Sequence, residues 1–145
     1  MKFKWMIAIC AMLLAAGCAT LQQVDTDWIP IGPEFPATKA KDVQIVSGRQ
    51  DITRPYGNLG LLRIKNIKPD RDNILMGIEK GRKIAASKGA DAIQINQYNS
   101  AEDDAAEPRI TLIIYAIKYV DNLTPEDEKA IEAFEVLGIL NESTR

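Results

Sequence analysis

A predicted helix ends and a predicted strand begins within the stretch Ile84-Ala85-Ala86-Ser87-Lys88-Gly89-Ala90-Asp91-Ala92-Ile93-Gln94-Ile95. Gly89 is expected to cap the helix, because glycine adopts the left-handed backbone conformation without steric cost. After it, Ile93 and Ile95 alternate with polar residues, which is typical of a strand. The sequence therefore predicts a helix over residues 70–88 and a strand over residues 90–98.

Small residues follow one face of this predicted helix. Gly77, Gly81 and Ala85 lie one turn apart, on the same face as the apolar residues Ile74 and Ile78. Each glycine costs about 1 kcal/mol of helix propensity relative to alanine, so its presence calls for a reason. We expect the stripe to let the helix approach a sheet closely. Contact between the stripe and a ligand is the alternative.

The remaining helices and strands are predicted from the alternation of apolar and polar residues, from residues that break regular structure, and from helix-capping residues. A final helix is expected to begin at Thr124-Pro125, with an apolar stripe formed by Ala130, Ala133, Phe134, Leu137 and Leu140. The strand over 109–120 is apolar on both faces, which predicts a central position in the sheet. The predicted strands cover residues 42–47, 59–67, 90–98 and 109–120. The order β-β-α-β-β-α predicts a single small α+β domain, with a four-stranded sheet packed by helices.

The N-terminal segment has the layout of an export signal. Lys2 and Lys4 precede an uncharged apolar run, which ends in the small residues Ala15, Ala16 and Gly17. The run is too short for a permanent membrane span, which needs about 20 residues. We therefore predict three parts: a lipoprotein signal peptide over 1–17, a lipidated N-terminus with a proline-rich tether over 18–41, and a globular α+β domain over 42–145.

The run Leu13-Leu14-Ala15-Ala16-Gly17-Cys18 resembles the lipobox of bacterial lipoproteins, with its leucine one place further out than usual. The resemblance implies lipidation of Cys18, cleavage before it and acylation of the new amine. Two or more acyl chains give a stable membrane anchor. Ala19 is similar to an outer-membrane sorting signal. We expect a palmitate-bearing lipoprotein of the bacterial cell envelope, anchored in the outer membrane and facing the periplasm. An ordinary secreted protein is the alternative.

Composition narrows the chemistry of the exported domain. The chain has 18 basic and 20 acidic residues, and removing Lys2 and Lys4 with the signal leaves 16 basic residues against the same 20 acidic ones. This acidic balance makes nucleic acid an unexpected partner. Without histidine, the usual zinc, copper and haem ligands and a Ser-His-Asp triad are missing. We expect no metal, no cofactor and no catalytic residues.

The junction over residues 84–95 resembles small bacterial domains of the YbjQ type and the outer-membrane sensor lipoprotein of the Rcs envelope-stress system. In those families an alanine-rich helix ends in a Gly-Ala-Asp or Gly-Ala-Asn turn before a strand. The preceding run Leu59-Gly-Leu-Leu-Arg-Ile-Lys65 is similar in kind, so the resemblance spans residues 43–120. It implies the fold and lipoprotein character. This chain lacks the disulfides of the Rcs sensor and the metal ligands associated with the YbjQ type.

One loop is the predicted contact surface for a partner. Residues 48–58 form an eleven-residue connection between two strands, and long loops on a rigid sheet often carry function. The loop contains Arg49, Arg54 and Tyr56, residue types that are enriched at binding hot spots. The alternative is that Tyr56 packs on the sheet edge while the arginines pair with Asp51.

These observations predict a non-catalytic, membrane-anchored envelope lipoprotein that binds another envelope component in a sensor, assembly or accessory role. The predicted partners are the membrane, through lipid on Cys18, and an envelope protein. A carboxylate-based periplasmic hydrolase or a small-ligand-binding protein is the alternative. An acidic cluster over residues 102–107 is expected to be a solvated loop rather than a calcium site. The sequence does not predict the oligomeric state.

Overall fold

The computed structural model describes residues 25–100 and 107–142, with the side chains of 97–100 and 136–142 left out. The predicted signal peptide and Cys18 lie outside the described residues. So do three members of the acidic cluster, Glu102, Asp103 and Asp104.

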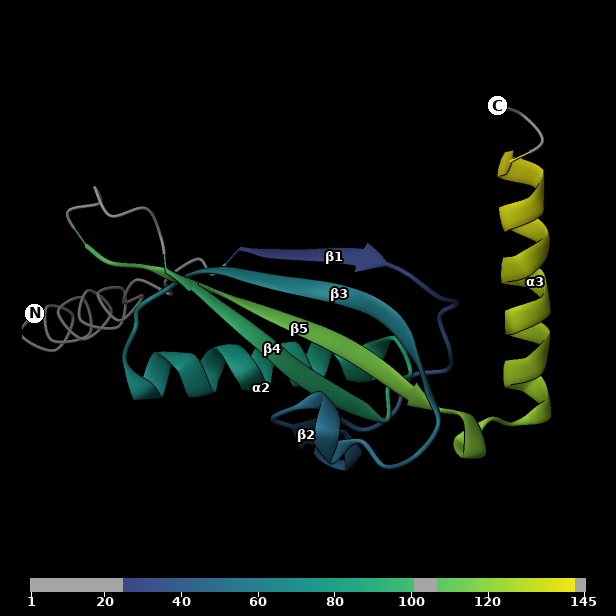
Figure 1. Ribbon diagram of the computed structural model, residues 1–145, viewed down its shortest axis with the longest axis horizontal. Helices are drawn as coiled ribbons and strands as arrows, with labels where there is room; N and C mark the ends of the chain where they lie inside the picture. The colour runs from purple at the N-terminus through teal and green to yellow at the C-terminus, as the bar shows by residue number, and fades with distance from the viewer. Residues whose placement is uncertain (1–24, 101–106, 143–145) are drawn as a thin grey trace, which may run out of the picture.

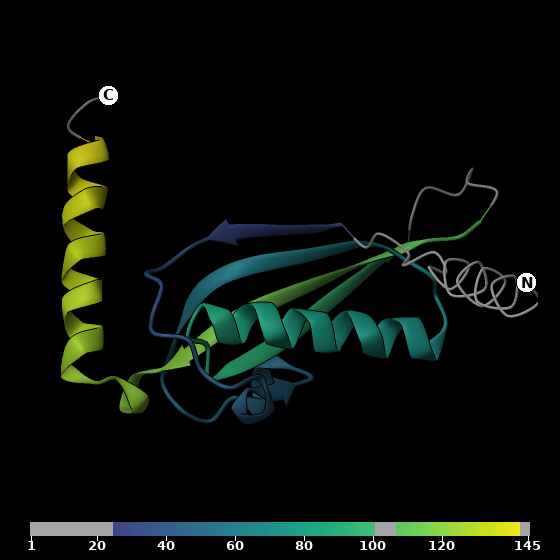
Figure 2. The same cartoon turned by 180° about the vertical axis from the view of Figure 1, so that it is seen from behind.

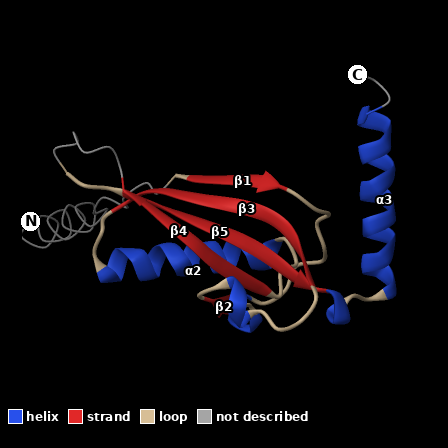
Figure 3. Ribbon diagram, viewed as in Figure 1, coloured by secondary structure: helices blue, strands red, loops and turns tan. Residues whose placement is uncertain are grey.

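A five-stranded sheet with one helix packed on it forms most of the described part of the chain, and a second long helix follows the sheet (Figures 1 and 3). The strand order is β1-β3-β5-β4-β2, so β5 is central, as its two apolar faces predicted. β2 pairs with β4 in parallel, and the other neighbours are antiparallel. The main elements are β1 (Thr26–Pro30), β2 (Gln44–Val46), β3 (Tyr56–Ile67), α2 (Arg71–Ser87), β4 (Ala92–Ser100), β5 (Ile110–Tyr119) and α3 (Pro125–Glu142).

The small-residue stripe of α2 faces the sheet, which confirms the packing interpretation (Figure 2). A Cβ atom added to Gly77 would lie 2.7 Å from Cδ1 of Ile67, and one added to Gly81 would lie 2.6 Å from Cδ1 of Ile114. Both distances are shorter than van der Waals contact. Helix and sheet therefore approach as closely as they do because these positions carry no side chain.

Both ends of α2 are capped, the C-terminal end at Gly89 as the sequence predicted. The Asp70 carboxylate accepts a hydrogen bond from the backbone N–H of Asn73, which satisfies one of the free donors of the first turn. At the other end Gly89 has a φ of +80°, so the left-handed cap is present. The backbone then enters β4 directly, which fixes the junction between helix and strand.

The predicted tether contributes a strand, so the prediction of four strands is wrong by one. Residues 26–30 pair with β3 as β1, and they lie inside the segment 18–41 that was assigned to the tether. Further along this segment, the side chain of Phe35 is only 7% exposed and its N–H donates to the carbonyl of Lys88. The carbonyls that end α2 need partners, and the segment supplies them. The folded unit thus begins earlier than residue 42.

The last helix differs from the expectation that helices pack the sheet. α3 begins as predicted: the N–H of Asp127 donates to Oγ1 of Thr124, and the N–H of Thr124 donates to the Asp127 carboxylate. It then runs away from the sheet (Figures 1 and 2). Ala130 and Ile131 in its early turns pack against the core, whereas Phe134 is 41% exposed. The core-facing side of the sheet is already occupied by α2.

A second, smaller apolar cluster lies on the face of the sheet that α2 does not cover. Val46, Ala92, Ile117 and Tyr119 are buried there, with Ile52 and Tyr56 packed against them. Ile52 belongs to the connection between β2 and β3, which includes a short 3-10 helix, η3 (Arg49–Asp51). This connection therefore covers one end of the helix-free face and leaves the rest of that face uncovered by any described helix.

Candidate functional site

Beside this second cluster, the helix-free face contains a polar hollow of about 320 Å³. Figure 1 looks onto this face, with α2 behind the sheet. The hollow lies over the central strands, next to the connection between β2 and β3. Its lining residues are Arg49, Tyr56, Asn58, Gln94, Asn96 and Tyr115.

Strand alternation places the polar side chains of the hollow on one face. Gln94 of β4 is directly opposite Tyr115 of β5 in the antiparallel ladder. Their chain neighbours Ile93 and Ile114 point to the other face, where both are fully buried against α2. The same peptide segments therefore build the apolar core on one side and the polar hollow on the other.

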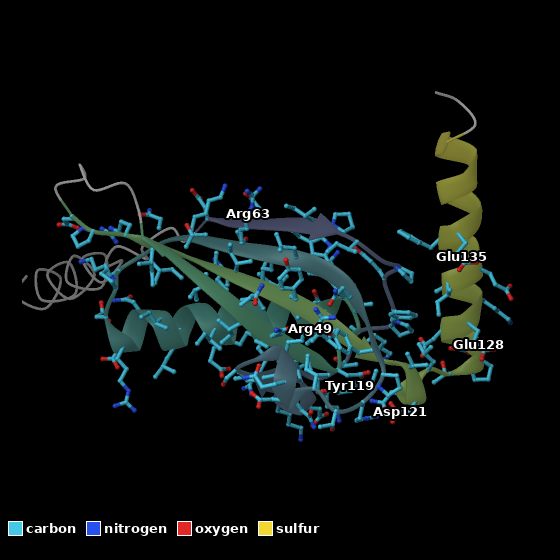
Figure 4. All side chains as sticks on the ribbon, in the orientation of Figure 1. Arg49, Arg63, Tyr119, Asp121, Glu128 and Glu135 are labelled. Atoms are coloured by element: carbon cyan, nitrogen blue, oxygen red, sulfur yellow. The ribbon has the colours of Figure 1, made fainter. Side chains whose placement is uncertain are left out.

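Arg49 reaches the hollow from outside the sheet. Figure 4 shows its side chain over the sheet, away from η3, which supplies it. Within residues 25–100 and 107–142, its guanidinium forms no hydrogen bond or ion pair, and the other five lining residues include no carboxylate. The hollow thus carries a positive charge that has no counter-ion among the described side chains.

Arg54, the second predicted contact residue, is held elsewhere. Its Nε donates to Oδ2 of Asp121 at 2.9 Å and its Nη2 to Oδ1 at 2.6 Å, and Nη2 also donates to Asn122 at 2.8 Å. The guanidinium carbon lies 4.2 Å from the centre of the Tyr119 ring. These contacts fasten the loop to the end of β5, so Arg54 positions the loop and does not line the hollow.

The ion pair shifts the pKa of both of its members. The hydrogen bond from Arg54 lowers the pKa of Asp121 below the ordinary value of 3.8; desolvation opposes this effect, and the charge of Arg54 adds to it. The same hydrogen bond raises the pKa of Arg54. Both groups are therefore charged throughout the physiological range, and the loop stays fastened.

Tyr56, the third predicted residue, has two roles. It is the first residue of β3 and packs against the second apolar cluster, and it also lines the hollow. The alternative prediction for this loop is therefore met in part: Tyr56 does pack on the sheet, but Arg54 pairs with Asp121 rather than Asp51. The structure brings Arg49 and Tyr56 together in the lining of the hollow, and Arg54 is not part of that lining.

Four of the six lining residues were not predicted from the sequence: Asn58, Gln94, Asn96 and Tyr115. A signal for two of them was present. Gln94 and Asn96 alternate with Ile93 and Ile95, so the second face of that strand was polar in the sequence. Tyr115 lies among isoleucines, and nothing in the local sequence distinguishes it from a core residue.

Charged side chains also line other hollows of the described surface. One, of about 140 Å³, is apolar and includes the buried Lys118, whose Nζ donates to the carbonyl of Gly89 and to Asp91, both at 3.4 Å. Another, of about 270 Å³, includes the carboxylates of Asp70 and Glu107. Within the described ranges, no group of three or more Cys, His, Asp or Glu side chains is placed to hold a metal ion.

Both carboxylates of the 270 Å³ hollow have structural partners. Asp70 caps α2, and Glu107 accepts a 2.8 Å hydrogen bond from Arg109. The backbone hydrogen bond from Asn73 is the main reason that the pKa of Asp70 is lowered, which favours its ionised form. A general acid requires the opposite shift.

No protein-family model matches the chain. No curated protein sequence matches it either. Among solved structures, the virulence factor FvfA of Francisella is similar, with 20% sequence identity and a TM-score of 0.48. The match covers 65% of this chain and 97% of that one. A likeness at this level assigns no function to the chain.

Proposed function

We propose that this chain is a non-catalytic, lipid-anchored lipoprotein of the bacterial envelope, which binds another envelope component through the helix-free face of its sheet. The anchor part of the proposal is supported by the lipobox-like run that ends at Cys18. The binding part is supported by the hollow and its unpaired Arg49.

The single observation that carries the binding proposal is the uncompensated charge of Arg49 in a polar hollow. Charged side chains near a protein surface usually find a counter-ion or face open water. Arg49 is exposed and has no counter-ion among the described residues, and it lines the hollow with two tyrosines and three amides. The connection that supplies it is held in place by the bidentate ion pair of Arg54. A rigid scaffold that presents convergent polar groups is the usual form of a binding site.

A hydrolase that uses carboxylates is the less favoured function. The hollow that contains two carboxylates uses Asp70 as a helix cap and Glu107 as an ion-pair partner of Arg109. The pKa of Asp70 is lowered, which is the opposite of the shift that acid catalysis requires. The polar hollow around Arg49 suits binding without chemistry, because no nucleophile or base lines it apart from tyrosine.

The proposed location is the periplasmic side of the outer membrane, with the lipid on Cys18 as the attachment. Among the described residues, no helix combines the length and the apolar character of a membrane span. The attachment through acyl groups rests on the lipobox-like run that ends at Cys18. The segment from Cys18 to the first residue of β1, Thr26, is short, so the folded unit would lie close to the membrane surface.

Site-specific photo-crosslinking in the living bacterium tests the binding face. A benzophenone amino acid is placed at Asn96, an exposed lining residue of the hollow, and separately at Met76, which is 62% exposed on the outer side of α2. We expect a defined high-mass adduct from position 96 and none from position 76. Adducts from position 76 alone, or equally from both positions, would contradict the proposed face.

A further inference from the structure

We propose that the hollow around Arg49 binds an acidic sugar, a pyranose ring that carries a carboxylate. This inference rests on the proposed function, because it names the chemistry of the component that the helix-free face recognises. It is argued from three properties of the lining: its charge, its amides and its aromatic rings.

The charge of the lining requires an anionic group on the ligand. Arg49 is the cation of the hollow, and none of the other lining residues is charged. A guanidinium presents its N–H donors in a planar fork that matches the two oxygens of a carboxylate. The single fork accounts for one carboxylate, and a ligand with several negative charges would find no second cation among the lining residues.

The amides require a ligand with several neutral polar groups. Asn58, Gln94 and Asn96 each provide a donor and an acceptor, and none forms a side-chain hydrogen bond within the described residues. Gln94 is only 7% exposed, yet neither polar atom of its side chain is fully buried without a partner. Its amide therefore opens into the hollow. Adjacent hydroxyl or N-acetyl groups on a sugar ring offer matching donors and acceptors.

The two tyrosines complete the recognition of a ring. Tyr56 and Tyr115 each have a flat apolar face and a polar hydroxyl. The C–H groups on one side of a pyranose pack on such a face while its hydroxyl groups bond to amides. The hollow, at about 320 Å³, is at the lower end of the range of about 300–1,000 Å³ for ligand sites. This volume suits one substituted ring rather than a long acyl chain.

The test compares two sugars that share one ring and differ in one carboxylate. N-acetylmuramic acid and N-acetylglucosamine are titrated at neutral pH into the full lipidated chain in non-ionic detergent, and the amide resonances are followed by NMR. We expect the acidic sugar to bind about tenfold more tightly, and to shift the resonances of residues 58, 94 and 96.

Matched variants assign the difference to Arg49. Arg49→Gln should reduce the affinity for the acidic sugar about tenfold, to that of the neutral sugar, without changing the melting temperature. Arg71→Gln makes the same chemical change at the exposed first residue of α2 and should change neither affinity.

Three results would overturn the inference: equal affinity for the two sugars, no binding of either, or unchanged affinity in Arg49→Gln. Tri-alanine, which carries a free carboxylate without a sugar ring, is titrated in parallel. Binding of the tripeptide as tight as that of the acidic sugar would also overturn it, and would indicate a peptide ligand. If any of these results appeared while crosslinks from position 96 persisted, the sugar inference would fail and the proposed binding face would stand.

Discussion

Arg54 and Asp121 are 67 positions apart in the chain, and they form a two-pronged ion pair, with Nε–Oδ2 at 2.9 Å and Nη2–Oδ1 at 2.6 Å. The pair joins the connection between β2 and β3 to the residues that follow β5 (Figure 4 labels Asp121 and Tyr119). Because Arg49 lies in the same connection, the pair also determines where the charge of the hollow is held.

Arg54→Gln should loosen this connection while leaving the fold intact. The pair is partly exposed, with side-chain exposures of 38% for Arg54 and 53% for Asp121, so its effect on global unfolding should be small. Hydrogen exchange of the backbone amides in residues 48–54 should become faster than in the Arg71→Gln control. Equal exchange in both variants would show that the loop is held by its other contacts, such as the packing of Ile52.

Acid should weaken the same connection, with a sign that follows from the lowered pKa of Asp121. A carboxyl whose pKa is lower in the folded state than in the unfolded state adds stability above the unfolded value, here 3.8. That contribution is lost as the pH falls through the folded value. Asp121→Asn should therefore be less stable than the native chain near pH 6, and the difference in unfolding free energy should narrow below pH 3.8.

Asp51→Asn is the control for this titration, because the Asp51 carboxylate forms no ion pair with the described residues. Denaturant melts between neutral and acidic pH measure both variants. A difference between Asp121→Asn and the native chain that stayed constant across this range would show that the ion pair does not contribute to the pH dependence.

Gly81→Leu should destabilise the fold by about 1–3 kcal/mol or more, because overpacking forces helix and sheet apart. A Cβ at this position would already lie 2.6 Å from Ile114 and 3.2 Å from Ile64. Gly57→Leu is the matched control, since a Cβ at Gly57 would meet no atom within 4 Å. Urea melts of both variants give the comparison. Equal midpoints would show that α2 can shift without cost.

Cys18→Ser should leave an unprocessed chain that takes up no palmitate. The expectation depends on the run Ala16-Gly17-Cys18, because only a thiol forms the thioether that carries the diacylglyceryl group. Metabolic labelling with palmitate and the mass of the mature chain measure it. Undiminished labelling of the variant would show that Cys18 is not the site of lipidation.

The sequence predicted α2 and the central strand β5 correctly, but it did not predict the edge strand β1. α2, its caps and the burial of Gly77 and Gly81 follow from local patterns, and the apolar faces of β5 identify a central strand. β1 was missed because it is a short edge strand that ends in proline, with Trp28 and Ile29 as its only apolar residues of size. Its pairing with β3 is tertiary information, which no local pattern contains.

For the last helix, α3, the sequence predicted the apolar face but not how much of that face is buried. Its apolar stripe predicted burial. Among the stripe residues whose side chains are described, Ala130 packs against the core, whereas Ala133 and Phe134 are exposed. An amphipathic pattern indicates that the apolar face of a helix tends to be buried, but it does not indicate which element of the protein buries that face. In this fold α2 already covers the sheet, so Phe134 stays 41% exposed.

The candidate site was predictable in its loop and only in part in its strands, where the polar alternation of Gln94 and Asn96 was the available signal. Loop length and composition identified Arg49 and Tyr56, which line the hollow, but they could not separate these residues from Arg54. That separation depends on Asp121, which lies far away in the sequence. Asn58 and Tyr115 join the site through strand register, and register is fixed only when the sheet is assembled.

The central claim is that the charge of Arg49 recruits an envelope component to the helix-free face. The most direct measurement is the yield of crosslinked adduct from a benzophenone at position 96, normalised to total lipoprotein, in the native, Arg49→Gln and Arg71→Gln chains. The account predicts that Arg49→Gln loses most of the adduct, while Arg71→Gln keeps the native yield. Equal yields in the two variants would contradict it.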